Sequence, residues 1–142
     1  SEIRHCAFIR GSALIGKGCV VGNSTELKNC ILFDKTQVPH YNYVGDSILG
    51  KGSHLGASSV ISNLKSDGKD VCVNIGGERV STHRRKFGAI LGDGADIGCG
   101  TVLNPGSIIG KGSRVYPHST IRGTVPSGCI YKTDGKIVKI EK

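Results

Sequence analysis

The chain has 142 residues, a length that suits a single domain. Aromatic residues make up only 5%, Trp is absent and there are 22 Gly, which excludes a globular core built around large aromatic side chains. The formal net charge of +8 favours anionic ligands; nucleic acid is disfavoured among them, because residues for base stacking are few and no binding motif is present.

Localisation and cysteine chemistry follow from two further features. The sequence has no run of 18 apolar residues and no charged and then apolar leader, so we expect a cytoplasmic protein that does not bind membranes. The six Cys residues are evenly spread and form no C-x-x-C pair. We therefore expect them to be reduced, small and buried.

An aliphatic or aromatic residue begins almost every run of six residues, from the first residues of the chain onward. These lead residues form three series: Ile3, Ile9, Ile15, Val21, Leu27 and Phe33; then Tyr43, Leu49, Leu55 and Ile61; then Leu91, Ile97, Leu103, Ile109, Val115 and Ile121. A period of six fits neither a helix nor a strand that alternates at every second residue. It predicts an all-β prism of short parallel strands, with three hexads per coil and coils stacked about 4.8 Å apart. Sixteen hexads give about five coils.

Two segments interrupt this repeat within residues 1–126. Residues 39–42 and 62–88 do not fit the hexads, so we expect both to leave the wall as inserted loops that carry function. The first loop holds His40, and the second is rich in Gly and charge. Residues 127–142 break the repeat again and read as strand, Asp-Gly turn and strand. We expect a C-terminal hairpin there that caps the open end of the last coil.

The pattern resembles the hexapeptide-repeat, left-handed parallel β-helix family, whose members typically form homotrimers and of which many are acyltransferases. The segment VPHYNYVGDS, followed by LGKGSHLGASSVISN, is similar to the acetyltransferase half of the bifunctional glucosamine-1-phosphate acetyltransferase/N-acetylglucosamine-1-phosphate uridyltransferases. The resemblance implies N-acetylation of a hexosamine 1-phosphate with acetyl-CoA as co-substrate, a step in UDP-N-acetylglucosamine synthesis. It also implies, as a partner, an N-terminal nucleotidyltransferase domain that this chain does not contain.

The same resemblance assigns the catalytic and sugar-phosphate residues. The catalytic base falls on His40, and the phosphate-binding residues fall on Arg10, Lys28 and Tyr43. Arg10 and Lys28 are 18 residues apart, one full coil, so they are expected to stack about 5 Å apart and to repel each other unless an anion lies between them. They also lie on a different edge from His40, which favours a site shared between the chains of a trimer.

The remaining assignments concern the acetyl donor and a departure from the family. Asn63 aligns with a donor-binding asparagine, Lys86 precedes Phe87 as in the family's Lys-Phe, and the backbone around Ala57 is expected to stabilise the oxyanion. Arg84 and Arg85 join Lys86 as candidate partners of the coenzyme A phosphates. His54 stands where the family has a substrate-side asparagine, which leaves the identity of the sugar open.

Two other functions compete with the acetyltransferase. Zinc enzymes share this type of fold, but the five histidines show no close ligand pair, so no metal site is predicted. The stronger alternative is a non-catalytic trimerisation or effector-sensing domain of a sugar-phosphate nucleotidyltransferase. His54 and Leu64, which differ from the family's asparagine and tyrosine, favour this alternative.

Overall fold

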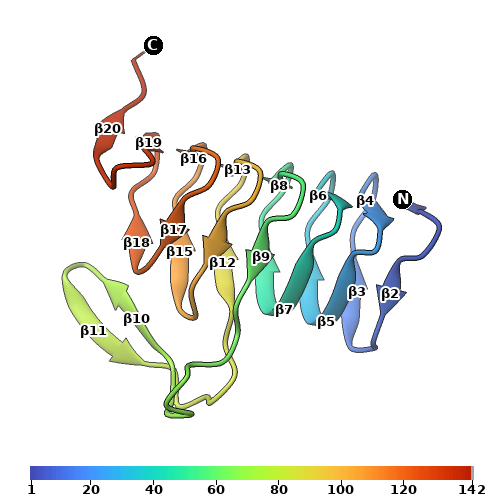
Figure 1. Ribbon diagram of the computed structural model, residues 1–142, viewed down its shortest axis with the longest axis horizontal. Coiled ribbons are helices and arrows are strands. Elements are labelled where there is room, and N and C mark those ends of the chain that lie inside the picture. Colours follow the sequence, from blue (N-terminus) through green and yellow to red (C-terminus); the bar gives the residue numbers. More distant parts are fainter. Residues whose placement is uncertain (142) are drawn as a thin grey trace.

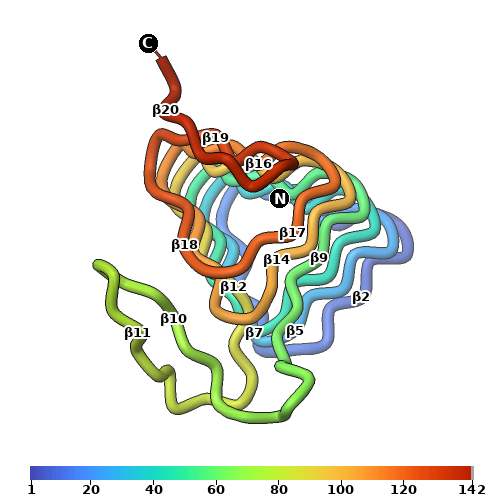
Figure 2. Tube along the Cα trace, turned by 60° about the vertical axis from the view of Figure 1, so that its left-hand side comes forward, coloured from blue at the N-terminus to red at the C-terminus, as the bar shows by residue number. Residues whose placement is uncertain are grey.

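The protein is described by a computed structural model in which residues 1–141 are placed, and it is built of β-strands wound into one stack of coils (Figure 1). Figure 2 brings the C-terminal end forward and shows the chain passing clockwise from β16 (Arg114–Val115) through β17 (Thr120–Ile121) to β18 (Thr124–Val125) as it approaches the viewer. That path is left-handed, so the predicted left-handed parallel β-helix is confirmed. Within residues 1–141, no helical segment has the length and hydropathy that crossing a bilayer requires.

The coils present three faces, each a parallel ladder. Face 1 contains β1 (Glu2–Ile3), β4 (Val20–Asn23), β6 (Gln37–His40), β8 (His54–Leu55), β13 (Asp96–Ile97), β16 (Arg114–Val115) and β19 (Cys129–Tyr131). Face 2 contains β2 (Phe8–Ile9), the first halves of β5 (Glu26–Leu32) and β7 (Tyr43–Leu49), β9 (Val60–Ile61), β14 (Val102–Leu103) and β17 (Thr120–Ile121). Face 3 contains β3 (Ala13–Ile15), the second halves of β5 and β7, β12 (Ala89–Leu91), β15 (Ser107–Ile109) and β18 (Thr124–Val125).

The axis of the stack is filled by one aliphatic side chain per face and coil. Fully buried members include Val21, Leu27, Leu32, Val38, Val44, Leu49, Leu55, Ile61, Leu91, Ile97, Leu103, Ile109 and Ile121. Three of these side chains fill each level of the axis, while Ser, Thr and Cys side chains occupy the tight space inside the corners. Face 1 has seven parallel strands in residues 1–141, more than the roughly five coils predicted, because Val38, Val125 and Tyr131 also occupy inward positions.

The predicted loop at residues 39–42 is wrong. Those residues continue the wall: β6 runs to His40, and Asn42 is buried at the next corner, where its amide donates to the Gly56 and Ser59 carbonyls at 2.9 and 3.0 Å. The inward residues are Leu32 and Val44 rather than Phe33, which is 51% exposed, and Tyr43. Coils in this region contain 17 residues, because β5 and β7 each turn a corner with one residue fewer. A strict count in sixes therefore loses the register by one residue at Phe33, and residues 39–42 then look like an insertion.

Residues 62–88 do leave the wall. The segment departs after β9 and returns at β12, and it contains an antiparallel hairpin of β10 (Cys72–Ile75) and β11 (Glu78–Ser81). Figure 1 shows this hairpin extending toward the C-terminal coils, where β10 lies against β15 and β18. At the C-terminal end, β19 pairs with β20 (Ile137–Lys139) in a second antiparallel hairpin. The division of the chain into a repeat domain and a capping hairpin stays a prediction.

The cysteines are only partly as expected. Cys19, Cys30 and Cys129 are buried, and all six thiols are free. Cys6 and Cys99 are exposed, against the prediction, because both lie at the corner between faces 1 and 2, where side chains turn outward. Burial raises the pKa of the Cys30 thiol to about 11, so this thiol stays protonated and unreactive at neutral pH.

Candidate active site

A hydrogen-bonded polar cluster lies at the corner between faces 2 and 3, where the 62–88 segment leaves the wall. We call it the Asp46 corner, and it consists of Lys28, Asn29, Asp46 and Asn63. Lys28 Nζ donates to both carboxylate oxygens of Asp46 at 3.0 and 3.2 Å. The side-chain amides of Asn29 and Asn63 donate to the same carboxylate at 2.7 and 2.6 Å. One carboxylate therefore fixes a cation and two amides on three neighbouring strands or strand ends.

The backbone explains why Asn and Asp occupy this corner. Asn29 and Asp46 have positive φ values of 49° and 50°, in the left-handed region that most side chains avoid. Gly11 and Gly106 occupy the same corner at other levels, with φ of 92° and 86°. Asn and Asp tolerate this conformation better than other residues with side chains. The two middle levels of the corner thus carry polar groups at positions that glycine fills elsewhere.

Asp46 is charged and well shielded. Its side chain is only 8% exposed, and that of Lys28 is 24% exposed. Burial by itself would raise the pKa of Asp46, but hydrogen bonds from Asn29, Lys28 and Asn63 and the charge of Lys28 outweigh burial and hold that pKa below its ordinary value. The carboxylate is therefore ionised at neutral pH and holds the cluster together.

Tyr43 extends the cluster across face 2. Its phenolic oxygen accepts a hydrogen bond from Asn63 Nδ2 at 3.2 Å. Gly45 allows this approach, because a Cβ at that position would lie 2.6 Å from the tyrosine oxygen and 2.7 Å from Asn63 Nδ2. Of the predicted substrate and donor residues, the fold thus brings Lys28, Tyr43 and Asn63 together.

Arg10 lies one coil below Lys28, as predicted, since Ile9 pairs with Leu27 in register. The expectation that the two cations repel each other unless an external anion separates them is wrong. Arg10 Nη1 lies 3.5 Å from Glu26 Oε2, and Lys28 is paired with Asp46. Each cation therefore has its own carboxylate, and the stacked pair alone does not require a phosphate.

His40 lies at a different corner, between faces 1 and 2. We call this the His40 corner; it comprises His40 at the end of β6 and Ala57, which stacks on it in the next coil. The His40 side chain is exposed, and its carbonyl accepts from the Ser58 N–H at 3.0 Å. Gly56 N–H donates to the Ile97 carbonyl at 2.7 Å. Around Ala57, where the backbone is expected to stabilise the oxyanion, the N–H groups of Gly56 and Ser58 thus have backbone partners, and that of Ala57 has none in residues 1–141.

His54 lies on face 1, in β8, beside the His40 corner. Its Nδ1 is 2.9 Å from Asp96 Oδ1 on β13, and its side chain is 40% exposed. Gln37 precedes it by one coil in the same column. The contact with Asp96 orients the imidazole ring on face 1.

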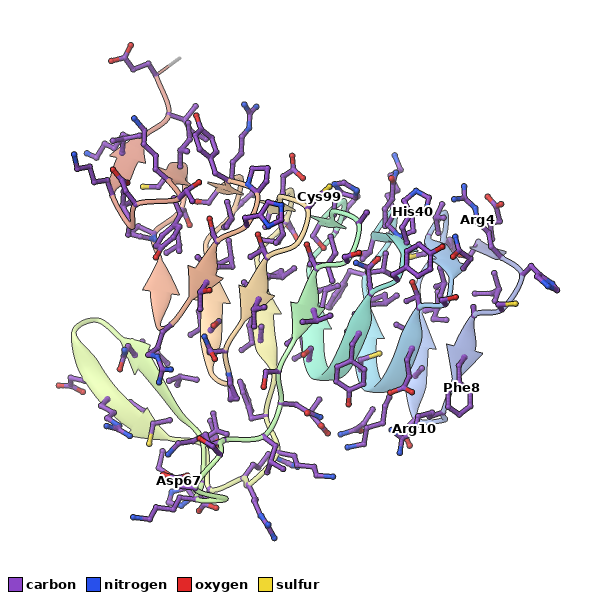
Figure 3. All side chains as sticks on the ribbon, viewed as in Figure 1. Arg4, Phe8, Arg10, His40, Asp67 and Cys99 are labelled. Carbon is purple, nitrogen blue, oxygen red and sulfur yellow. The ribbon has the colours of Figure 1, made fainter. Side chains whose placement is uncertain are left out.

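The two corners are separated within one chain. Three residue steps of extended strand, roughly 10 Å, separate Asn42 at one corner from Gly45 at the other. Figure 3 shows His40 and Arg10 on opposite edges of the stack, pointing away from each other. The chain therefore assembles the phosphate-side residues at one edge and the candidate base at another.

A groove of about 420 Å³ adjoins the Asp46 corner on face 3. Its floor is an outward column of aliphatic side chains in register, Leu14, Ile31, Ile48 and Ile90. The returning part of the 62–88 segment supplies Arg84, Lys86 and Phe87 to its rim, whereas Arg85 turns away toward Gly68. The groove thus combines an apolar floor with two cations.

Sequence reasoning missed Asp46 and Asn29. Both fall on corner positions, to which the hexad count assigned no function. The observation that would have found Asp46 is its position about one coil after Lys28, where a carboxylate is placed to neutralise that cation. Asn29 follows from the same column, because it replaces the glycine of the preceding level.

The stacked coils and their polar corners define a hexapeptide-repeat β-helix protein. The fold is shared with PerB from Caulobacter crescentus, solved with CoA and GDP-perosamine, at a TM-score of 0.74 and 20% identity, over 94% of this chain and 54% of that one. At this identity the similarity establishes the fold alone.

The family is identified by sequence. The model of the GMPPB C-terminal domain matches residues 1–87, and the chain belongs to that family. The bifunctional protein GlmU of Methanococcus maripaludis is 37% identical over 133 residues, which cover 93% of this chain and 32% of that protein. A bifunctional sugar-1-phosphate nucleotidylyltransferase/acetyltransferase of Sulfurisphaera tokodaii is 33% identical over 126 residues, 89% of this chain and 31% of that protein. The chain spans about a third of the length of these relatives.

Proposed function

We propose that the protein is an acetyl-CoA-dependent N-acetyltransferase that acts on the amine of a hexosamine 1-phosphate. The observation that carries this proposal is the Asp46 corner, where one buried carboxylate holds Lys28 and Asn63, and Asn63 in turn contacts Tyr43. The relative named a bifunctional nucleotidylyltransferase/acetyltransferase and the coenzyme A bound by PerB support the choice of reaction. Because those relatives are bifunctional, we also propose a nucleotidyltransferase domain as a partner.

Lys28 and Tyr43 bind the sugar phosphate in this proposal. An ammonium group has three donors, and Asp46 occupies Lys28 from one side only, so a donor remains for a phosphate oxygen. The phenol of Tyr43 accepts from Asn63 and keeps its own O–H for the substrate. Arg10, whose contact with Glu26 is long and exposed, adds a second cation at the outer edge. Held at its phosphate, the sugar presents its amine in a fixed direction.

His40 acts as the general base. The neutral amine attacks the thioester carbon of acetyl-CoA, the new C–N bond forms, and His40 accepts the proton that the amine loses. The N–H of Ala57 lies one coil above His40 and stabilises the tetrahedral oxyanion. Collapse of the intermediate breaks the C–S bond and releases coenzyme A, whose sulfur takes up the proton. His54, oriented by Asp96 on the neighbouring strand of face 1, binds a sugar hydroxyl.

The donor is bound by the groove on face 3. Its aliphatic floor suits the pantetheine arm of acetyl-CoA, and Lys86 and Arg84 at the rim suit the phosphates. Asn63, which donates to Asp46 at the edge of this groove, contacts the donor close to its thioester. A groove of about 420 Å³ is within the usual range of small-molecule sites.

The distance between the corners supports a homotrimer with shared sites. About 10 Å of strand separates the two corners, before either side chain is counted. A hexosamine 1-phosphate is therefore too short to reach from Lys28 to His40 across face 2 of one chain. We propose that His40 of one chain completes the Asp46 corner of its neighbour. Cyclic symmetry then gives three identical sites per trimer.

One observation favours the non-catalytic alternative. Both phosphate-binding cations already have carboxylate partners, so the Asp46 corner is also suited to a structural role in an effector-sensing or trimerisation domain. The two functions differ in whether covalent product forms, and this difference can be measured directly.

The test is mass-spectrometric detection of acetylated product from acetyl-CoA with glucosamine 1-phosphate or galactosamine 1-phosphate. We expect product from the wild type and at least about a hundredfold less from His40→Ala, since a general base contributes about 10²–10⁴-fold. His5→Ala, which removes another exposed histidine of the wall, is the matched control and should retain activity. Folded protein that yields no product with either sugar would overturn the proposal in favour of the non-catalytic domain.

A further inference from the structure

A second polar groove lies between the β10–β11 hairpin and the wall, away from the Asp46 corner and the His40 corner. It has a volume of about 200 Å³. The hairpin segment contributes Lys65, Cys72, Asn74 and Arg79, and the wall contributes Asn104, Pro105, Gly106, Arg122 and Gly123. Three cations thus converge from two separate parts of the chain. Figures 1 and 2 both show the hairpin alongside the C-terminal coils.

The charge in this groove is not neutralised from within. Among residues 1–141, no carboxylate lines it, and neither Arg79 nor Arg122 makes an ion pair. Lys65 is paired with Asp67 at 3.4 Å, outside the lining. This differs from the Asp46 corner, where Lys28 is paired with Asp46. Two unpaired guanidinium groups in one small groove repel each other unless an anion binds between them.

The hairpin is held in a defined position over the wall. Thr124 Oγ1 donates to the Asn74 carbonyl at 2.6 Å. Gly106 is required beneath the hairpin, because a Cβ there would lie 2.2 Å from the Cys72 carbonyl oxygen, and its φ of 86° favours glycine as well. The groove is therefore a built feature of the fold, and its cations are presented at a fixed spacing.

The size and donors of the groove indicate the ligand. At about 200 Å³ it is smaller than the roughly 300–1,000 Å³ of sites that enclose a whole small molecule, so it suits one anionic group of a larger ligand. Arginine guanidinium groups bind phosphate oxygens in a bidentate manner. The Asn74 amide adds a neutral donor near Gly123, whereas Asn104 Nδ2 is already used by the Ile121 carbonyl at 2.9 Å.

We propose that this groove, formed by Arg79 and Lys65 of the insertion and Arg122 of the wall, binds the phosphate or diphosphate group of a nucleotide-type ligand. The inference does not depend on the proposed acetyl transfer, because binding is measured without turnover. Two sources of the same chemistry are possible: the nucleotide end of coenzyme A, or a free nucleotide that acts as an effector. They are distinguished by the probes below.

The test is isothermal titration calorimetry of the full chain with adenosine 3′,5′-bisphosphate and, separately, with inorganic pyrophosphate. We expect at least one probe to bind, with an affinity that falls as salt is raised. Arg122→Gln and Arg79→Gln should each weaken that binding by about tenfold or more, since each removes a charge-assisted contact. Arg114→Gln, which removes an exposed arginine of face 1 with no ion pair in residues 1–141, is the matched control and should change nothing.

The outcomes separate the two sources. Two results together would assign the groove to the coenzyme. Adenosine 3′,5′-bisphosphate would bind more tightly than pyrophosphate, and Arg122→Gln would weaken the binding of coenzyme A but not that of acetylpantetheine. Binding of pyrophosphate that Arg122→Gln abolishes, with coenzyme A binding unchanged, would assign it to a free effector. Absence of binding by both probes, or binding that both variants leave unchanged, would overturn the proposal. An inactive protein that still binds a probe through Arg122 would refute only the acetyltransferase.

Discussion

The two corners that flank face 2 are built in opposite ways. At the Asp46 corner, a carboxylate that is 8% exposed holds Lys28, Asn29 and Asn63 by four hydrogen bonds from side chains. At the His40 corner, the candidate base is exposed, and only its backbone is tied to the next coil. The chain therefore fixes the side chains of the proposed binding residues and leaves the side chain of the proposed base exposed. We therefore expect mutations at the Asp46 corner to change stability, and mutations at the His40 corner to change catalysis without changing stability.

We expect the largest difference between effects on kcat and effects on stability when His40 and Asp46 are each substituted. His40→Ala should lower kcat by about 10²–10⁴-fold and leave the free energy of unfolding within about 0.5 kcal/mol of wild type, because an exposed side chain is lost. Asp46→Asn should lower both kcat and stability. Steady-state kinetics and urea unfolding on the same preparations measure the two effects. Equal loss of stability in both variants would contradict the comparison.

The 17-residue coils that position the Asp46 corner place Leu32 inward and Phe33 outward. Substitutions of these two neighbours should therefore differ in their effect on stability. Leu32→Ala should lower the free energy of unfolding by about 2–5 kcal/mol, because it leaves a cavity in the axis of the stack. Phe33→Ala, at a neighbouring residue that is 51% exposed, should cost about 0.5 kcal/mol or less. Chemical denaturation checks both. A larger loss of stability in Phe33→Ala than in Leu32→Ala would indicate that Phe33 points inward, as the strict hexad count predicts. It would contradict the assignment of the corners.

This contrast shows how far the sequence determined the fold. From Leu91 to Ile121 the hexads are uninterrupted, and every predicted lead residue is buried. Between Leu27 and Leu49 the pattern is ambiguous, because Leu32 and Phe33 are adjacent and both are hydrophobic. Sequence alone gave no reason to prefer five residues over six. The deciding factor is the corner backbone: Asn29 and Asp46 turn the chain within a continuous strand, so the inward residues on the two sides of that corner are five residues apart, Leu27 to Leu32 and Val44 to Leu49.

The site was predictable to a similar extent. The resemblance placed Lys28, Tyr43 and Asn63 in one site, and the structure brings them together. The carboxylate that joins them, Asp46, was missed, since a register error of one residue conceals which side chains share a corner. Lys28 and His40 are far apart because the width of face 2 separates their corners. This separation became visible only once the structure showed which residues lie at which corner.

Removing the cation of the Asp46 corner should have an intermediate effect. Lys28→Met leaves the shielded carboxylate of Asp46 without its counter-charge and should lower stability by about 1–3 kcal/mol. Arg10→Gln breaks a long, exposed contact with Glu26 and should cost well under about 1 kcal/mol. Thermal unfolding of the two variants side by side tests whether Lys28 belongs to the built corner and Arg10 to its rim.

The smallest effect is the dependence of stability on pH. Because the pKa of Asp46 is lower in the folded protein than in the unfolded chain, its ionisation stabilises the fold above about pH 4, and this contribution is lost as the pH falls through the folded pKa. The stability difference between wild type and Asp46→Asn should therefore be constant from about pH 6 to pH 8 and shrink below about pH 4. A difference that persists unchanged at low pH would show that the charge of Asp46 is unimportant.

The most direct test of the account is complementation between two inactive variants. His40→Ala and Lys28→Gln are expressed separately, unfolded, mixed in equal amounts and refolded, and acetylated hexosamine 1-phosphate is then measured. If His40 of one chain completes the Asp46 corner of another, random assembly should give about a quarter of wild-type sites, each with both residues intact. Activity that stays at the level of the separate variants, while wild type treated in the same way recovers, would contradict a site shared between the two corners.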